Sequence, residues 1–315
     1  MKKIFQHQSQ TKKSIFSKEK REYFKKWLSP RIKELRYSLH LIKQSPLAMV
    51  GIAIILILVF TAILAPFISP YGPEEHIWSE SKQPPSWKHL FGTDETGGDV
   101  FTKVLWGARI SIEIGLIVVL GGLGLGIIIG AFAGYYGGYI DEFIMRITDI
   151  FLSIPYLILA MGVAAILGKS IENVMIAMIV VWWPAYTRLV RGQILSVREN
   201  QYVEAAKSVG AGDTRIIFRH ILPNSMAPLI VQTTMDLGNA ILTAAGLSFL
   251  GFGAGPGAAE WGRMVSDSRN YFMSCPWMMV FPGLAIFITV LGFNLVGDGL
   301  RDILDPRLRR GGGKT

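Results

Sequence analysis

The chain has 315 residues, of which 50% are hydrophobic and 17% are charged, and its formal net charge is +9. Soluble domains carry about a quarter charged residues; here the deficit arises from several long, almost uncharged stretches, which favours a membrane protein over a soluble one. A basic chain with several spans is an unlikely nucleic-acid binder, so we predict a lipid bilayer as its surroundings and no nucleic acid as partner.

Residues 1–45 are predicted to be a basic cytoplasmic segment, because 13 Lys and Arg precede Pro46. Residues 18–40 mix aromatic and aliphatic side chains with basic ones, which predicts an amphipathic helix on the anionic inner leaflet, interrupted at Pro30. For residues 1–17 a partly disordered basic tail stays open. The first apolar run exceeds the length usual in a signal peptide, so we expect no cleavable one.

Six apolar segments are predicted to span the membrane, since a span needs about 20 residues. The fourth is short and is expected to extend at both ends. Proline at positions 155 and 184 is expected to bend or interrupt the third and fourth helices. The segments are Pro46–Ile68, Ile110–Ala133, Ile150–Leu167, Val174–Thr187, Ala227–Phe249 and Trp277–Val296.

Basic residues orient these spans. With six spans, 25 Lys and Arg fall on the side of the termini and 7 on the other side, so both termini are predicted to be cytoplasmic. The sequence thus predicts an all-α polytopic membrane protein. Its parts are a first span with a long extracytoplasmic loop at 46–108, a membrane core at 109–300 that includes a cytoplasmic loop at 196–223, and a cytoplasmic tail at 301–315.

The outer loop, residues 69–108, is rich in Pro, Gly and Trp and is too long for a simple connector. It is predicted either to cap a pathway or meet an extracytoplasmic partner, or to be a structured but passive lid. In the second span, four glycines spaced by four residues share one helix face and favour close helix packing. They are Gly122, Gly126, Gly130 and Gly134.

A polar stripe crosses the fifth span. Asp236 has Gln232 one turn before it and Asn239 three residues after it. Intramembrane charge is costly and indicates a pathway or a polar partner. We favour a stripe that lines an aqueous pathway, with hydrogen bonding between helices as the alternative. Glu113 lies nearer a span end, where it can reach the headgroups.

The cytoplasmic loop is predicted to form a rigid helix–turn–helix. Residues 196–209 favour a helix in which Ala205 and Ala206 offer a small surface. Gly210 and Gly212 are expected to end it with positive φ angles. Asp213 is then a suitable N-cap for a second helix at 214–221, which Leu222-Pro223 closes. Such a shape fits a groove on a soluble partner.

This loop resembles the EAA signature of ABC importer permeases, which docks on the ATPase subunit: Glu204-Ala205-Ala206, then Gly210, then Leu222-Pro223. Other segments resemble the dipeptide/oligopeptide permease family, and the place of Phe91-Gly92-Thr93-Asp94 after the first span resembles its C-type subunit. They are residues 183–192, 247–253 and 297–307. Two positions depart from the pattern, since His220 replaces an aliphatic residue and Gly98 replaces an arginine.

The resemblance covers residues 40–310 and implies a type I ABC importer permease in a prokaryotic inner membrane. It implies a peptide pathway shared with a second, related permease subunit as a heterodimer, two ATPases that carry ATP-Mg, and an extracytoplasmic binding protein. The residues expected to couple to the ATPase are Glu204, Ala205, Ala206, Gly210, Asp213, Leu222 and Pro223.

Several alternatives remain at this point. Related permeases carry nickel or oligosaccharides, and an ion-coupled secondary transporter would need inverted repeats and a midplane ion site. We find no catalytic constellation for an intramembrane enzyme. The tail Gly311–Thr315 has leucine where a phosphate-binding loop needs its first glycine, so we expect no catalysis and no cofactor in this chain.

Overall fold

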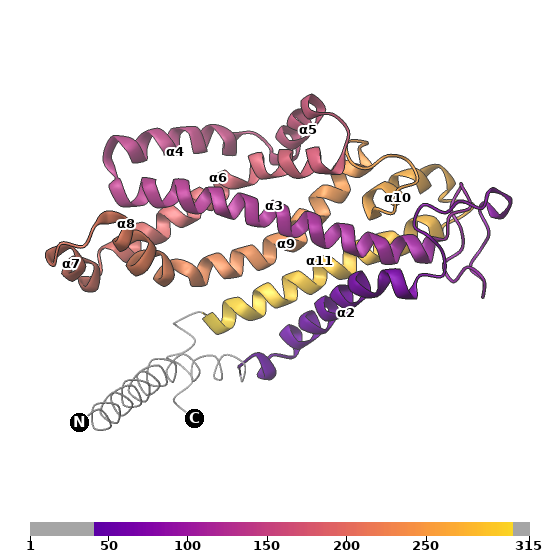
Figure 1. The fold of residues 1–315 in the computed structure, drawn as a ribbon, viewed down its shortest axis with the longest axis horizontal. Helices are drawn as coiled ribbons and strands as arrows, with labels where there is room; N and C mark the ends of the chain where they lie inside the picture. Colours follow the sequence, from indigo (N-terminus) through magenta and orange to yellow (C-terminus); the bar gives the residue numbers. More distant parts are fainter. Residues whose placement is uncertain (1–40, 305–315) are drawn as a thin grey trace, which may run out of the picture.

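The computed structural model describes residues 41–304, and every regular element in this range is a helix. Five long helices run side by side as an elongated bundle, and α3 packs against both α6 and α9 (Figure 1). These are α2 (Pro46–Ile68), α3 (Val100–Tyr136), α6 (Ile171–Arg198), α9 (Met226–Phe249) and α11 (Trp277–Leu304). The predicted amphipathic helix at 18–40 and the tail beyond residue 304 lie outside the described residues.

Five shorter α-helices of the described residues pack around the bundle or lie at its ends. They are α4 (Gly138–Ser153), α5 (Tyr156–Leu167), α7 (Gln201–Ser208), α8 (Asp213–Arg215) and α10 (Trp261–Ser268). Helices α7 and α8 lie at one end of the bundle in Figure 1, and α10 lies at the other end with the long loop that precedes α3.

The first predicted span has the helix bounds that the sequence predicts, and the second does not. Helix α2 has the predicted bounds, and Ser45 caps it by accepting a hydrogen bond from the amide of Ala48 at 3.4 Å. Helix α3 begins ten residues before its predicted start, because Asp99 caps it through the amide of Thr102 at 2.8 Å. The predicted loop end at residue 108 is therefore wrong, and the loop stops at residue 99.

The third predicted span is not one straight helix. Helix α4 ends at Ser153, α5 begins at Tyr156, and the two are bent by 91°. Pro155 stands at the N-cap of α5, so the predicted interruption at this proline is confirmed, and the predicted segment 150–167 is divided between α4 and α5. Helix α6 extends past both predicted ends and continues through Pro184.

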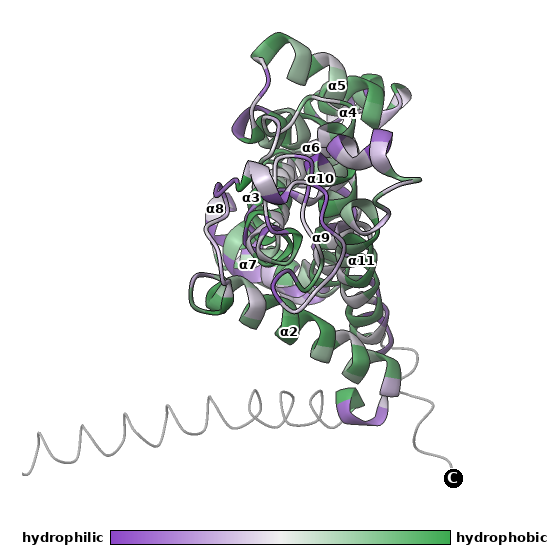
Figure 2. Cartoon of the chain, turned by 90° about the vertical axis from the view of Figure 1, so that its right-hand side faces the viewer, coloured by the Kyte–Doolittle hydropathy of each residue, from purple (hydrophilic) through white to green (hydrophobic). Residues whose placement is uncertain are grey.

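Four helices of the described residues are long and apolar enough to cross a membrane, namely α2, α3, α6 and α11, or five if the bent α4–α5 pair counts as one span. Helix α9 is long enough at 24 residues, but it carries the polar stripe. The count of six spans therefore stays a prediction. The ribbon of α2 is mostly hydrophobic in Figure 2, and only 22% of its apolar window is buried, as expected for a helix that faces lipid or another subunit.

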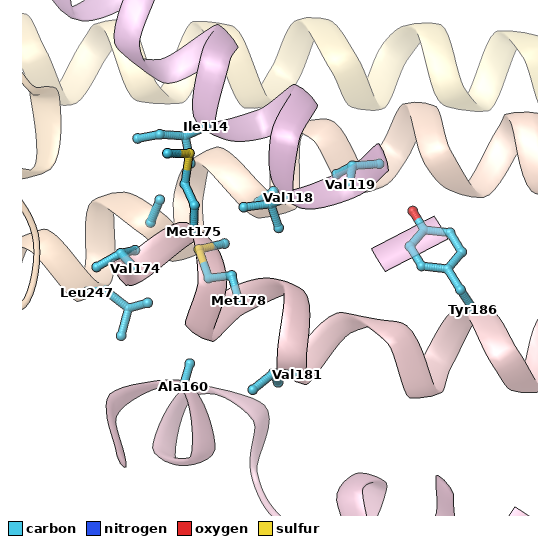
Figure 3. Close-up of a cluster of buried hydrophobic side chains, with 12 residues drawn as sticks. Ile114, Val118, Val119, Ala160, Val174, Met175, Met178, Val181, Tyr186 and Leu247 are labelled. Atoms are coloured by element: carbon cyan, nitrogen blue, oxygen red, sulfur yellow. The ribbon is translucent and has the colours of Figure 1, made fainter. Parts of the chain in front are cut away.

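The core is built around the contact between α3 and α6. Figure 3 shows Met175 and Met178 of α6 beside Val118 of α3, and Val181 of α6 near Ala160 of α5. The glycine face of α3 permits this closeness, since a Cβ added at Gly130 would lie 2.6 Å from the carbonyl oxygen of Thr187. The predicted packing role of the four glycines is thus confirmed, and α3 and α6 form the rigid centre that positions both ends of the molecule.

Candidate functional site

The knob, which we define as residues 199–225, begins with α7 and a tight turn. The amide of Gly210 donates to the carbonyl of Lys207 at 2.9 Å, and the amide of Ala211 donates to that of Ala206 at 3.1 Å. With a φ of +77° at Gly210, this is a Schellman motif. The predicted helix end at Gly210 is confirmed. Gly212 has a φ of −67°, so its predicted positive φ is wrong, and it serves as the N-cap of α8.

Asp213 is the first residue of α8 and does not cap it, contrary to the sequence prediction. Its carboxylate instead accepts a hydrogen bond from the hydroxyl of Tyr135, at the end of α3, at 2.7 Å. The ammonium of Lys207 lies 5.5 Å from the centre of the Tyr135 ring. Local capping rules could not find this contact, because Tyr135 is 78 residues away in sequence.

The second half of the knob differs from the predicted α-helix at 214–221. After three residues of α8 the chain forms a π-helix at Ile216–Ile221 and a 3-10 turn at Leu222–Ser225, which leads into α9. The amide of Leu222 donates to the carbonyl of Ile217, and Pro223 has no amide hydrogen to donate. The change of helix type accommodates the proline, so Leu222-Pro223 does not close the helix as predicted.

An apolar cluster anchors the knob to the bundle. Val203 and Ala206 of α7 and Ile216, Ile217 and Ile221 of the π-helix segment are buried against α3 and α6. Ala206 therefore faces inward, so the small surface predicted for Ala205 and Ala206 is divided: Ala206 packs against the bundle and Ala205 is exposed. Glu204, Ala205 and Gly210 are exposed.

The outer part of the knob offers apolar contacts as well. Val209, Phe218 and Tyr202 are exposed by 83%, 53% and 43%, and Leu222 is half-buried beside the exposed Pro223. An exposed apolar surface with a polar rim is typical of a protein interaction site. The predicted coupling residues thus divide into an inner anchor and an outer contact surface.

The polar stripe lines a cavity of about 420 Å³ between α5, α6 and α9. The amide of Gln232 donates to the carboxylate of Asp236 at 3.0 Å, within α9. Asp236 is only 8% exposed, and its carboxylate lies close to polar atoms of Tyr186 and Asn239. The structure brings the three predicted residues together, and it adds aromatic walls from Trp182 and Tyr156 that the spacing within α9 could not indicate.

The cap, which we define as residues 69–99, lies at the opposite end from the knob (Figure 1). Its centre is Asp94, whose carboxylate accepts hydrogen bonds from the amides of Thr96 and Gly98 and from Lys103 at 2.6 Å. Lys103 is 2% exposed and also donates to the carbonyl of Gly257. Burial raises the pKa of Asp94, but Lys103 and these hydrogen bonds hold it below the usual value.

Further contacts hold the cap together and tie it to a helix distant in sequence. Within the cap, His89 lies between Glu80 and Asp99, with 2.9 Å from each ring nitrogen to a carboxylate oxygen. The indole of Trp277 donates to the carbonyl of Thr93 at 3.1 Å. A Cβ at Gly98 would lie 2.7 Å from the ammonium of Lys103, so the space that an arginine side chain would need there is already filled.

Two family models match the chain. The model of the binding-protein-dependent transport system inner membrane component matches residues 126–310, and that of the N-terminal transmembrane domain of oligopeptide transport permease C matches residues 35–85. The chain belongs to the binding-protein-dependent permease family. The second match supports the C-type subunit within it, so the chain is a multi-pass inner-membrane permease.

Curated relatives agree with this family. The chain is 48% identical to the dipeptide transport system permease DppC of Alkalihalophilus pseudofirmus, over 85% of this chain and 88% of the relative. It is 47% identical to the probable D,D-dipeptide permease DdpC of Escherichia coli K12, over 85% and 90%. It is 44% identical to the glutathione permease GsiD of Pectobacterium atrosepticum, over 81% and 85%.

A solved structure supports the fold. An inward-facing form of the MetNI methionine ABC transporter aligns with a TM-score of 0.53 and 19% identity, over 64% of this chain and 96% of that chain. At this identity the likeness concerns the fold alone, and it is the expected type I importer permease fold.

Proposed function

We propose that this permease subunit forms half of a peptide pathway and that its knob receives the mechanical work of two separate ATPases. The observation that carries the proposal is the structure of the knob. Its outer surface is exposed, and its buried side chains form one apolar cluster with side chains of α3 and α6. A second permease subunit, as a heterodimer, and an extracytoplasmic binding protein complete the proposed importer. The knob would face the cytoplasm, as the basic residues predict.

The proposed coupling runs through α3. This helix extends from the cap to the knob over 37 residues, and the glycine face fixes it against α6. When the ATPases close around ATP-Mg, a push on the knob would tilt α3 and α6 together. The ATPases shift the access of the pathway only if their contacts with the knob differ between the two states.

Peptides are the substrate class that we propose. The three relatives reported above are named for dipeptides, D,D-dipeptides and glutathione, and all of these substrates are small peptides. Nickel and oligosaccharides are not favoured by these names. Among the described residues no group of three or more His, Cys, Asp or Glu could hold a metal ion.

The test is uptake of a labelled dipeptide into liposomes that contain the assembled importer, loaded binding protein outside and ATP inside. We expect uptake with ATP and none with a non-hydrolysable analogue. Uptake driven by an ion gradient in the absence of ATP would contradict the proposal and would favour a secondary transporter.

Variants at Gly210 test the role of the knob. Gly210→Val places a β-branched residue at a φ of +77° and should abolish uptake while membrane insertion stays normal. Gly210→Asn is the matched control, because asparagine tolerates this backbone conformation, and it should retain most of the uptake. Wild-type uptake by Gly210→Val would refute the coupling assignment.

A further inference from the structure

We propose that Asp236 binds the terminal ammonium group of the peptide as it passes through the cavity between α5, α6 and α9. This inference rests on the proposed function, and it specifies where and by which chemistry the permease contacts its substrate. It concerns a step after release from the binding protein, and so a selectivity that belongs to the membrane subunit itself.

The cavity has the size and the lining of a small-molecule site. Its volume of about 420 Å³ falls in the range of roughly 300–1,000 Å³ typical of such sites. Leu152, Tyr156, Trp182 and Leu242 provide apolar and aromatic walls, and the polar groups come almost entirely from α9. This division suits a ligand with one polar end and an apolar body.

The polar side carries an unbalanced negative charge. Asp236 is the only carboxylate among the lining residues, which include no Lys, Arg or His. In the described part of the chain Asp236 takes part in none of the ion pairs. The polar groups around its carboxylate, from Gln232, Asn239, Tyr186 and Trp182, are all neutral. A buried carboxylate among apolar spans is costly without a cation, and such residues mark substrate or ion pathways.

A peptide ammonium matches this site in charge, donors and surroundings. An ammonium group has three donors, and the carboxylate of Asp236 and the side-chain oxygens of Gln232 and Asn239 are acceptors on one face of α9. The faces of aromatic rings attract cations, and Trp182 and Tyr156 also offer apolar contact to a side chain. With no basic residue in the lining, this cavity offers the carboxyl end of the peptide no cationic partner.

The experiment measures binding to the assembled importer in nanodiscs, without binding protein or nucleotide, by saturation-transfer difference NMR. The two probes are alanyl-phenylalanine and N-acetyl-alanyl-phenylalanine, which differ in the charge at the amino end. We expect a Kd at least about 10-fold lower for the free dipeptide than for the acetylated one, the loss expected when a buried charge pair is removed. Equal Kd values in the wild type would overturn the proposal without any variant.

Variants assign the preference to Asp236. Asp236→Asn keeps the size and the hydrogen-bond acceptor but removes the charge, so the two probes should bind equally. The matched control is Glu113→Gln, which removes an exposed carboxylate of α3 that lines a different cavity and should keep the full preference. Preference retained in Asp236→Asn would refute the proposal and would leave Asp236 as an acceptor within α9.

Two further measurements separate a failure of this inference from a folding defect and from a failure of the proposed function. If Asp236→Asn fails to assemble, Asp236→Glu keeps the charge and should keep a preference, whereas its complete loss would count against the proposal. Uptake with ATP by the wild type and by Glu113→Gln is recorded on the same preparations. Normal uptake together with an unchanged preference in Asp236→Asn would refute this inference alone, while loss of ATP dependence would refute the proposed function.

Discussion

The knob and the cap lie at opposite ends of the bundle and are held by different forces. The knob is anchored by buried isoleucine, valine and alanine side chains that pack on α3 and α6. The cap is tied to the bundle by the ion pair of Asp94 with Lys103 and by the indole of Trp277, and it is held together internally by His89 between two carboxylates. Both ends contact α3, which is the element that joins them.

This difference suggests different mechanical behaviour. Apolar packing is non-directional, so the knob can tilt by a small amount while its contacts are kept. Hydrogen bonds weaken steeply when their angle is lost, so the cap should hold one geometry until several bonds break together. We infer that the cap sets the resting arrangement and that the knob is the end that can be pushed.

The largest expected effect is that of Lys103→Met, which leaves Asp94 buried without its cation. Breaking a buried ion pair by removing one partner costs about 3–5 kcal/mol. Because Cys275 is buried in the cluster below the cap, opening of the cap should expose its thiol. Maleimide labelling of Cys275 should become faster by about 100-fold or more, since each 1.4 kcal/mol is roughly tenfold.

The matched control is Lys88→Met, at an ion pair of the same cap whose lysine is 58% exposed. Exposed pairs contribute little to stability, so the labelling rate of Cys275 should hardly change. If both variants label at the wild-type rate, the ion pair of Asp94 does not hold the cap and the comparison between the two ends fails.

A smaller effect is expected at the knob from Ile221→Ala. Ile221 is fully buried in the anchoring cluster, and removal of such a side chain costs about 2–5 kcal/mol, depending on how far the cavity collapses. The exposed Arg215 and Arg219 are trypsin sites on the knob, so cleavage of the isolated permease should become faster. Val209→Ala, at an exposed position of the same knob, should leave the cleavage rate unchanged.

The sequence predicted a membrane helix well where the apolar run begins directly after a capping residue, as α2 does after Ser45. It failed at the start of α3, because Lys103 resembles a loop residue until its burial and its partners Asp94 and Gly257 are known. It also failed at the third span, since hydropathy records how apolar a segment is and not its direction. The proline at position 155 predicted an interruption, but the 91° angle between α4 and α5 is known only from the structure.

The candidate sites show the same limit. The spacing of Gln232, Asp236 and Asn239 was enough to place them on one face of α9, and the turn at Gly210 followed from local rules. The capping role of Asp213 was wrong because Tyr135 binds its carboxylate from a distant helix. Contacts between elements, which also build the cavity walls and the cap, are absent from local sequence patterns.

A third prediction compares two glycines of the knob in the isolated permease. Neither has an atom within 4 Å of an added Cβ, but only Gly210 has a positive φ. Gly210→Ala should therefore destabilise the turn by about 1–2 kcal/mol through backbone strain alone. Gly212→Ala, at a φ of −67°, should cost less, so trypsin should cleave the knob faster only in the first variant.

The smallest expected effect is that of Tyr135→Phe, which removes the hydroxyl that donates to Asp213 while the ring stays in place. Exposed hydrogen bonds contribute about 0.5–1.5 kcal/mol, so the knob of the isolated permease should become only slightly more sensitive to trypsin. If the hydrogen bond is the only link between the two residues, Asp213→Ala and the double variant should be as sensitive as Tyr135→Phe, because the bond can be lost only once. Sensitivities that simply add would show that the two side chains act independently, and α3 would then be linked to the knob by apolar packing without a directional contact.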